Sequence, residues 1–201
     1  MVSKEDIVFR QLLTLSDGGR VLLRPLTKED RQELIDLFQG VSPEDLRYMR
    51  HDVTDANLVG DWVDNLDYDD VLPLVAVINE RLVGSATLHF FQGPGRHRAA
   101  VRIYLAKEVR RRGVGSRMIQ ALIDISKRRN IYMVEAQIIN EQATVIRAFQ
   151  NLGFVRKCIL DNYFILPDGE LRDVAHLILS CLLYTSPSPR DQREHLVCRL
   201  L

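Results

Sequence analysis

The sequence is poor in cysteine and has no long apolar run. Its three cysteines, at positions 158, 181 and 198, are too few and too widely spaced for a disulfide framework or a structural zinc site. No stretch reaches the roughly 18 apolar residues of a membrane-spanning helix, and the N-terminus lacks the basic and then apolar layout of a signal peptide. These absences predict a cytoplasmic protein that binds no metal and does not span a membrane.

The sequence also lacks a net charge, because 27 Lys and Arg balance 27 Asp and Glu. The balance hides an asymmetry along the chain. Residues 51–70 carry seven aspartates and no Lys or Arg, whereas residues 96–129 carry eleven Lys and Arg against two acidic residues. The basic segment favours an anionic ligand, and the acidic segment predicts either attraction for a cationic amine or an ordinary solvated surface.

The last part of the chain differs from the rest. Residues 181–191 resemble the translation of a sequencing-library transposase adapter, and residues 195–201 resemble the outer end of that adapter. We therefore expect one domain over residues 1–180, followed by a non-native, disordered tail over residues 181–201. A natural tail rich in proline and serine is the alternative.

Periodicity and turn signals predict alternating extended and helical segments. Extended segments are expected as a hairpin over 9–24, then at 71–78, 82–91, 98–105, 132–139, 154–166 and 171–179. Helices are expected over 27–40, from Ser42 onward, over 56–66, for about 15 residues after Gly113, and over 142–152. The order predicts an α/β fold of the α+β type, with a mixed, mostly antiparallel sheet of about six to seven strands and about four to five helices.

A glycine-rich turn lies between the 98–105 strand and the helix that follows. Gly113 and Gly115 stand one residue apart after three consecutive arginines, Arg110, Arg111 and Arg112. Such a turn exposes backbone N–H groups, and the helix start adds free amides and the positive end of its dipole, so the turn predicts a phosphate site. Met118 replaces the third glycine of a dinucleotide motif, and no P-loop lysine follows. A plain basic turn is the alternative.

The strand, the Arg-x-x-Gly-x-Gly turn and the helix together resemble the acyl-CoA pyrophosphate loop of the GNAT superfamily of N-acyltransferases. Further along, Asn140 follows a strand, and residues 148–154 resemble the family's helix that ends in Leu-Gly-Phe. The resemblance covers about residues 10–180 and implies the GNAT fold. The start of the chain is similar to bacterial protein-lysine acetyltransferases, whereas residues 135–175 are more similar to enzymes that acetylate ribosomal-protein N-termini.

The resemblance implies acetyl-CoA as co-substrate and places its contacts on this sequence. Backbone groups of the strand end would pair with the pantetheine arm, and the glycine turn would hold the pyrophosphate. The implied contact residues are Ile103, Tyr104, Leu105, Arg110, Arg111, Arg112, Gly113, Val114, Gly115, Ser116, Asn140 and Phe149.

The sequence offers more than one candidate for the residue that accepts the proton of the attacking amine. Many family members carry a Glu at the position of Ala100, whereas those that acetylate protein N-termini use a Glu five residues before an Asn, the spacing of Glu135 and Asn140. A carboxylate within an apolar strand is costly to bury, and burial would raise its pKa toward that of a general base. Glu135 is therefore the first candidate, with a structural carboxylate as the alternative, and His89 is the reserve.

The general acid departs from the family pattern, because Phe149 stands where a Tyr often protonates the leaving thiolate. Tyr163 is our candidate and Tyr104 the second, unless the thiolate leaves unassisted. Cys158 has no neighbouring signal of a nucleophile, so direct attack is expected.

The leading hypothesis is an N-acetyltransferase that acts on a primary amine of a protein lysine, a protein N-terminus or a small molecule. A catalytically weak acyl-CoA sensor is the alternative. Nucleic acid is not expected as a partner, because the aromatic residues are not interleaved with the arginines. We expect a monomer or a homodimer.

Overall fold

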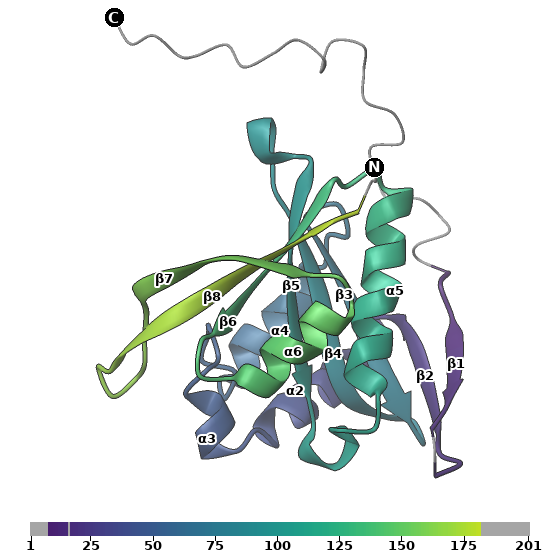
Figure 1. Cartoon of the computed structure of the whole chain (residues 1–201). Helices are drawn as coiled ribbons and strands as arrows, with labels where there is room; N and C mark the ends of the chain where they lie inside the picture. Colours follow the sequence, from purple (N-terminus) through teal and green to yellow (C-terminus); the bar gives the residue numbers. More distant parts are fainter. Residues whose placement is uncertain (1–7, 16, 182–201) are drawn as a thin grey trace, which may run out of the picture.

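The computed structural model describes residues 8–15 and 17–181 (Figure 1). The strands are β1 (Gln11–Thr14), β2 (Arg20–Pro25), β3 (Val71–Ile78), β4 (Arg81–Phe90), β5 (Arg98–Leu105), β6 (Met133–Ile139), β7 (Val155–Ile165) and β8 (Leu171–Ser180). The α-helices are α2 (Arg31–Gln39), α3 (Pro43–Leu46), α4 (Ala56–Asp64), α5 (Val114–Arg128) and α6 (Ala143–Asn151). Every segment predicted from periodicity is present, although α3 is a single turn that continues as i→i+3 turns to Met49.

The strands form one sheet in the order β1-β2-β3-β4-β5-β6-β8-β7. Neighbouring strands are antiparallel except β5 and β6, which run parallel. The predicted count of six to seven strands was too low. Both terminal hairpins join the central strands, so the sheet has eight strands.

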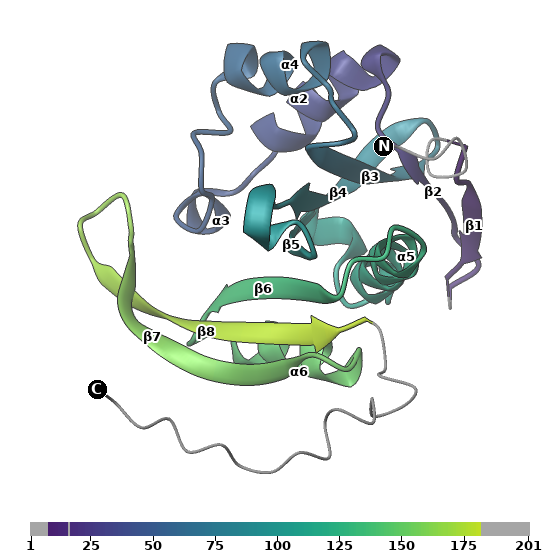
Figure 2. The same cartoon turned by 90° about the horizontal axis from the view of Figure 1, so that it is seen from above.

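Helices cover both faces of the sheet (Figure 2). On one face, Leu122 of α5 and Phe149 of α6 pack in a core with Ala136 of β6. On the other face, helices α2 and α4 pack in a second core against β3 and β4. The side chains of β5 alternate between these layers, since Ile103 packs on the α5 core and Tyr104 on the α2 core. Odd-numbered residues of β5 therefore face α5, and even-numbered residues face α2.

Strands β5 and β6 diverge after a short pairing. Their register covers only Arg98–Ala100 of β5 against Met133–Glu135 of β6, and Figure 2 shows the two strands separating beyond that point. The later residues of β5 still pair with β4, and those of β6 still pair with β8. The divergence therefore leaves one backbone edge of each strand without a partner strand, and it opens the sheet from one face to the other.

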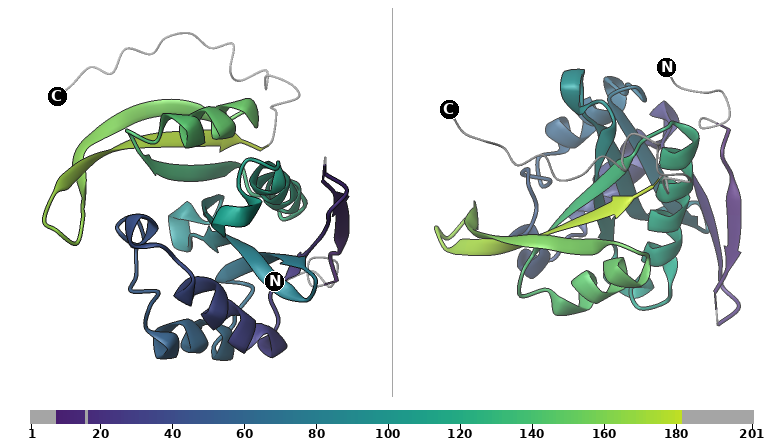
Figure 3. Two further views of the ribbon diagram at one scale, coloured as in Figure 1. Left: turned by 90° about the horizontal axis from the view of Figure 1, so that it is seen from below. Right: turned by 45° about the horizontal axis from the view of Figure 1, so that its top comes forward.

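The β7–β8 hairpin curves away from the sheet toward α3 (Figure 3). Arg47, next to α3, contacts Asp168 at 2.6 Å and Glu170 at 3.3 Å at the hairpin tip. These exposed ion pairs connect two segments that are far apart in the sequence. The connection closes one side of the space in front of the diverging strands.

The C-terminal end of the described chain is Cys181. Its side chain is buried and its N–H donates to the carbonyl of Tyr132 at 2.8 Å. This bond continues the edge of β8 to residue 181. The remainder of the expected tail, 182–201, lies outside the described residues. Within the described part of the chain, no helix is long and apolar enough to cross a membrane.

An ion pair fixes the start of α2 to the sheet. Arg24 of β2 donates to both carboxylate oxygens of Asp30, at 2.6 and 2.5 Å, and Asp30 also accepts from the N–H of Thr27 at 2.7 Å. Burial alone would raise the pKa of Asp30, but the Arg24 and Thr27 hydrogen bonds outweigh it and lower the pKa. The pair therefore stabilises the fold above the ordinary carboxyl pKa, and the contribution is lost as the pH falls through the lowered value.

We expect Asp30→Asn to lower the free energy of unfolding by about 3 kcal/mol, since it leaves a part-buried guanidinium without its charged partner. Urea denaturation at pH 7 measures the loss. Asp36→Asn is the matched control, because Asp36 is exposed on α2 and its carboxylate accepts from the neutral amide of Gln32 at 2.8 Å. Equal stability of the two variants would contradict the role assigned to the Arg24–Asp30 pair.

Candidate active site

A cavity of about 1070 Å³ occupies the opening between β5 and β6. The glycine turn and the start of α5 line one end, and α6 contributes Phe149. At the other end, the cavity reaches the α2 and α4 face of the sheet, where Thr87 and His89 of β4 and Arg102 of β5 line it. Its position follows from the divergence of the two strands. The cavity connects the two faces of the sheet.

The glycine turn adopts the conformation that the sequence suggested. Arg111 has φ 60° and Gly113 has φ 82°, and α5 begins directly afterward at Val114. An added Cβ at Gly113 would meet no atom within 4 Å, so the space above the turn is open. Arg111, Gly113, Gly115 and Ser116 line the cavity. The first amides of α5 have no acceptor within their own helix and are therefore available to a ligand.

Gly115 has a different role from Gly113. A Cβ at Gly115 would lie 3.0 Å from Leu105 Cδ1 and 3.5 Å from Ile103 Cδ1. The absence of a side chain at this position lets the first turn of α5 approach the end of β5 closely. The two glycines thus serve two needs, a left-handed backbone at Gly113 and close packing at Gly115.

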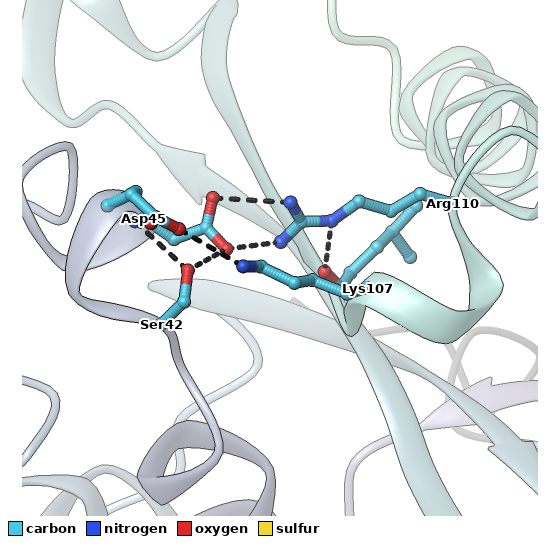
Figure 4. A network of polar contacts seen from close by, with 6 residues as sticks. Ser42, Asp45, Lys107 and Arg110 are labelled. Carbon is cyan, nitrogen blue, oxygen red and sulfur yellow. Dashed lines mark hydrogen bonds and ion pairs between the residues drawn. The ribbon is translucent and has the colours of Figure 1, made fainter.

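The three arginines of the turn point in different directions. The Nη atoms of Arg110 contact Asp45 of α3 at 3.2 and 2.7 Å, and its Nε donates to the carbonyl of Leu105 at 2.9 Å (Figure 4). Arg112 forms an ion pair with Asp17 in the β1–β2 turn. Arg111 is exposed and lines the cavity, and it forms no ion pair with a carboxylate of the described residues. Arg110 and Arg112 therefore hold the turn in place.

Helix α3 is itself ordered for its contact with Arg110. Ser42 caps the helix by accepting from the N–H of Asp45 at 3.4 Å, and its hydroxyl donates to the Asp45 carboxylate at 3.0 Å. Lys107 of the turn adds a bond to Glu44 at 3.1 Å. Figure 4 shows Ser42, Asp45, Lys107 and Arg110 converging between α3 and the turn. The Arg110 bonds lower the pKa of Asp45, so the carboxylate stays ionised at neutral pH.

The free backbone edge of β5 can be assigned from its hydrogen bonds. The carbonyl of Arg98 accepts from Phe91, and the N–H of Ala106 donates to Val83, so even-numbered residues face β4. The carbonyl of His97 accepts from Met133 of β6, so odd-numbered residues face β6. By the alternation of a parallel ladder, the Ala100–Glu135 pairing engages the N–H of Val101 with the carbonyl of Glu135, so the first N–H of this edge that points into the gap is that of Ile103. Leu105 also faces the gap, but its carbonyl is occupied by Arg110.

Three residues form a row across the α2 face at the closed end of the gap. His89 of β4 is the register partner of Ala100, and Ala100 is the register partner of Glu135. Since adjacent strands lie about 4.8 Å apart, His89 and Glu135 have Cα atoms about 10 Å apart on either side of the small Ala100 side chain. The row therefore leaves space above Ala100 between an imidazole and a carboxylate.

Glu135 is buried and already has partners. One carboxylate oxygen accepts from Arg98 Nη1 at 2.9 Å, and the other lies 3.3 Å from His176 Nε2. Glu135 is not among the residues that line the cavity, although the next residue, Ala136, is. Its carboxylate thus lies beside the cavity and is engaged in an ion pair.

His89 lines the cavity and is half-buried. Burial, followed by the charges of Arg102, Arg50 and His51, lowers its pKa from 6.5 to about 4. Its Nε2 lies 2.9 Å from the hydroxyl of Thr87. The ring is therefore neutral at physiological pH and faces the space above Ala100.

The remaining predicted site residues lie in several places. Phe149 lines the cavity and packs edge-on against Phe154 at 5.0 Å. Val114 is buried in the core, and the N–H of Asn140 donates to the carbonyl of Asp173; neither residue lines the cavity. Tyr163 is exposed on β7, outside the cavity lining, with its hydroxyl 3.4 Å from Gln137 Nε2.

Tyr104 and Ile103 both line the cavity. Tyr104 stacks near Phe38, and burial raises the pKa of its hydroxyl, so the hydroxyl keeps its proton at neutral pH. Sequence reasoning missed Arg50 and Arg102 as cavity residues, and it missed Asp45 as the partner of Arg110. The period-two alternation of β5 could have placed Arg102 on the same face as Ala100, whereas no local signal marked Arg50.

Comparisons with known proteins agree with this geometry. A family model described as the Acetyltransferase (GNAT) family matches residues 32–154. The GNAT domain of S. lividans PAT is similar in structure, with a TM-score of 0.72 and 20% identity over 90% of this chain and 99% of that one. The ribosomal-protein-S5-alanine acetyltransferase from Vibrio fischeri has a TM-score of 0.71 and 16% identity, with 80% and 92% covered.

A third solved structure is a putative acetyltransferase from Salmonella typhimurium with its cofactor acetyl-CoA. It has a TM-score of 0.69 and 18% identity over 84% of this chain and 98% of that one. At such identities these three structures show a shared fold, while the family model covers more than half of the chain.

Proposed function

The chain belongs to the GNAT acetyltransferase family, as its resemblance to that family indicated, and from this premise we propose that it transfers an acetyl group from acetyl-CoA to a primary amine by direct attack. One observation carries the proposal: a single cavity connects the glycine turn, through the gap between β5 and β6, to the polar face that holds His89 and Arg102. An anionic acyl carrier and an amine could enter such a cavity from opposite faces of the sheet.

The residues around the gap fit acetyl-CoA. The open space above Gly113 and the free amides at the start of α5 suit a pyrophosphate, and Arg111 adds a positive charge. The N–H of Ile103, which lies beyond the β5–β6 pairing, suits a carbonyl of a pantetheine arm. When bound, acetyl-CoA would supply an acetyl thioester whose thiol is the leaving group. The backbone N–H at Ile103 is then placed to stabilise charge on a carbonyl oxygen in the gap.

The amine must lose a proton to attack, and we propose His89 as the residue that accepts it. His89 is neutral and faces the cavity, whereas both oxygens of Glu135 are engaged beside it. This geometry supports the reverse of the order that the sequence suggested. Glu135 would then act by fixing Arg98 and His176 at the closed end of the gap, and it remains the alternative base.

For the leaving thiolate we propose Tyr104 ahead of Tyr163 as the proton donor. Tyr104 lines the cavity and keeps its proton at neutral pH, whereas Tyr163 is exposed on β7. Tyr104 also belongs to β5, the strand whose free backbone edge faces the gap. Phe149, which stands at the family's usual tyrosine position, then serves as an apolar wall.

The assay that tests the proposed function is thiol release from acetyl-CoA in the presence of a panel of amines. The panel contains lysine-bearing peptides, peptides with free N-termini, polyamines and amino acids. We expect amine-dependent thiol release together with an N-acetylated product found by mass spectrometry. Tight acetyl-CoA binding without turnover on any amine would instead support a sensor, the reading that Phe149 and Ala100 favour.

A further inference from the structure

Two guanidinium groups lie on the polar face of the cavity without a carboxylate partner. Arg102 of β5 is half-buried and lines the cavity. Arg50, which follows α3, lines the cavity at its exposed edge, where its Nη2 donates to the amide oxygen of Gln137 at 2.8 Å and its guanidinium stacks over Phe164 at 4.8 Å. Among the described residues, neither Arg50 nor Arg102 forms an ion pair.

The two arginines face the same cavity from the two diverging strands, because Arg102 lies on β5 and Arg50 is bonded to Gln137 of β6. Burial, and then the positive charge of Arg50, lower the pKa of Arg102. His89 and His51 also line this cavity, and they bring no negative charge. Two guanidiniums that repel each other in a partly enclosed space favour an anion between them, because an oxyanion would offset both charges and form bidentate hydrogen bonds.

This pair is distinct from the expected pyrophosphate site. Arg102 shares its face with Ala100 and Tyr104, and Tyr104 packs on the α2 core. The glycine turn leads into α5, which packs on the opposite face through Ile103 and Leu105. The sheet therefore separates the arginine pair from the turn, and the pair faces the side from which an amine would approach His89.

Carboxylates also line the same cavity, but at its exposed mouth. Asp61, Asp67 and Asp70 contribute to the lining, and all three are exposed. Asp70 precedes Val71, the register partner of His89. A cavity lined by exposed carboxylates and by two arginines, of which Arg102 is half-buried, complements a molecule that carries both charges.

We propose that Arg50 and Arg102 bind the carboxylate of the acceptor, and that the acceptor is therefore a free amino acid whose amine is presented to His89. The proposal rests on the proposed acetyl transfer for its reaction, and on the arginine pair alone for its binding site. No bond to either arginine is formed or broken, because both arginines hold the substrate by ion pairs. The reaction is the direct attack described above, with the amine proton passing to His89.

The test compares each common L-amino acid with its own primary amide. The two differ in the charge of one group, and rates are expressed per concentration of unprotonated amine because the amide is the weaker base. We expect kcat/KM to favour at least one acid over its amide. Arg102→Gln should lower kcat/KM for that acid by about 10- to 100-fold, the range of a lost charge-assisted hydrogen bond, and should cause no comparable loss for the amide.

Arg81→Gln is the matched control, because Arg81 lies on β4, is exposed and does not line the cavity. Its kcat/KM should equal that of the unmodified chain. A second readout is independent of turnover: calorimetry of the same amino acid against the full chain without acetyl-CoA should show binding that Arg102→Gln weakens and Arg81→Gln does not. Loss of acetyl-CoA affinity in Arg102→Gln would overturn the proposal by assigning Arg102 to the acyl carrier.

The outcomes separate this proposal from the proposed function. Amine-dependent thiol release that shows no preference for the acid and no effect of Arg102→Gln would overturn the carboxylate site while leaving acetyl transfer intact. Arg102-dependent binding of an amino acid without any turnover would support the carboxylate site and contradict the proposed acetyl transfer. A tetrapeptide with an N-terminal aspartate carries its carboxylate on a peptide, and Arg102-dependent acetylation of that peptide alone would overturn the assignment of a free amino acid.

Discussion

Replacing Gly113 with glutamate is expected to abolish measurable acetyl-CoA binding. The substitution places a negative charge and a side chain in the open space above the turn, where the amides of α5 and Arg111 would hold the pyrophosphate. Repulsion of a phosphate and loss of its hydrogen bonds together should weaken binding by at least about 100-fold. Isothermal titration of acetyl-CoA into the purified chain measures the change.

The strained backbone at this position calls for a matched control. Gly113 has φ 82°, a conformation that costs any L side chain about 1 kcal/mol. Gly18 has the same φ of 82°, and a Cβ there would also meet nothing within 4 Å, but it lies in the β1–β2 turn away from the cavity. Gly18→Glu should therefore carry a similar strain and keep its affinity for acetyl-CoA. Unchanged affinity in Gly113→Glu would refute the location of the pyrophosphate site.

The fold could be predicted from the sequence to a large extent because its signals are local. Alternation predicted β3, β4, β5 and β6, and the helical spacing from Val114 to Ile125 predicted α5. The strand count was too low because whether a hairpin joins a central sheet depends on contacts between segments far apart in the chain. The short α3 was likewise unpredictable in length, since its end depends on how the following turns pack on the α2 core.

The features of the candidate site that are local in the sequence could likewise be predicted, whereas those that depend on distant contacts could not. The glycine turn could be predicted because Gly113 and Gly115 stand next to a strand and a helix in the sequence. The partner of Arg110 could not, because Asp45 is 65 residues away and its role depends on how α3 is placed. Similarly, the arginines were interpreted as one basic run, whereas the structure directs Arg112 to Asp17 and Arg102 to the opposite face of the sheet.

The burial of Glu135 shows that the free-energy cost of burying a carboxylate does not by itself identify a catalytic residue. The sequence indicated that a carboxylate in an apolar strand needs a purpose, and Glu135 is indeed buried. Its partners, Arg98 of β5 and His176 of β8, supply a structural purpose that no spacing along the chain could reveal. A buried charge is retained when other groups satisfy it, so burial by itself does not distinguish catalysis from packing.

Replacing His89 with glutamine is expected to lower kcat for the preferred amine by at least about 100-fold, the usual contribution of a general base. Glu135→Gln should change kcat much less and lower stability instead, because it leaves Arg98 without its charged partner. His97→Gln is the matched histidine control, since His97 lies in the β4–β5 connection outside the cavity lining and packs near Tyr132. A larger loss of kcat in Glu135→Gln than in His89→Gln would restore Glu135 as the base.

The pH dependence of kcat/KM provides a sharper test of His89, because the groups facing it are known. His89 accepts a proton only when neutral, so activity should be present above its pKa of about 4 and fall as the pH drops through that value. Burial lowers this pKa first, and the charges of Arg102, Arg50 and His51 lower it further. Removing one of these charges stabilises the imidazolium, so Arg102→Gln should move the acidic limb to higher pH.

The same electrostatics connect the base to the proposed acceptor. A carboxylate bound between Arg50 and Arg102 would offset the charges that depress the pKa of His89, and the imidazole would become a stronger base when such an acceptor is present. The acidic limb of kcat, which reports the bound state, should then lie at higher pH than that of kcat/KM for an amino acid, and the two should coincide for its amide. Coincident limbs for both substrates would show that the arginines do not act on His89 through the bound carboxylate.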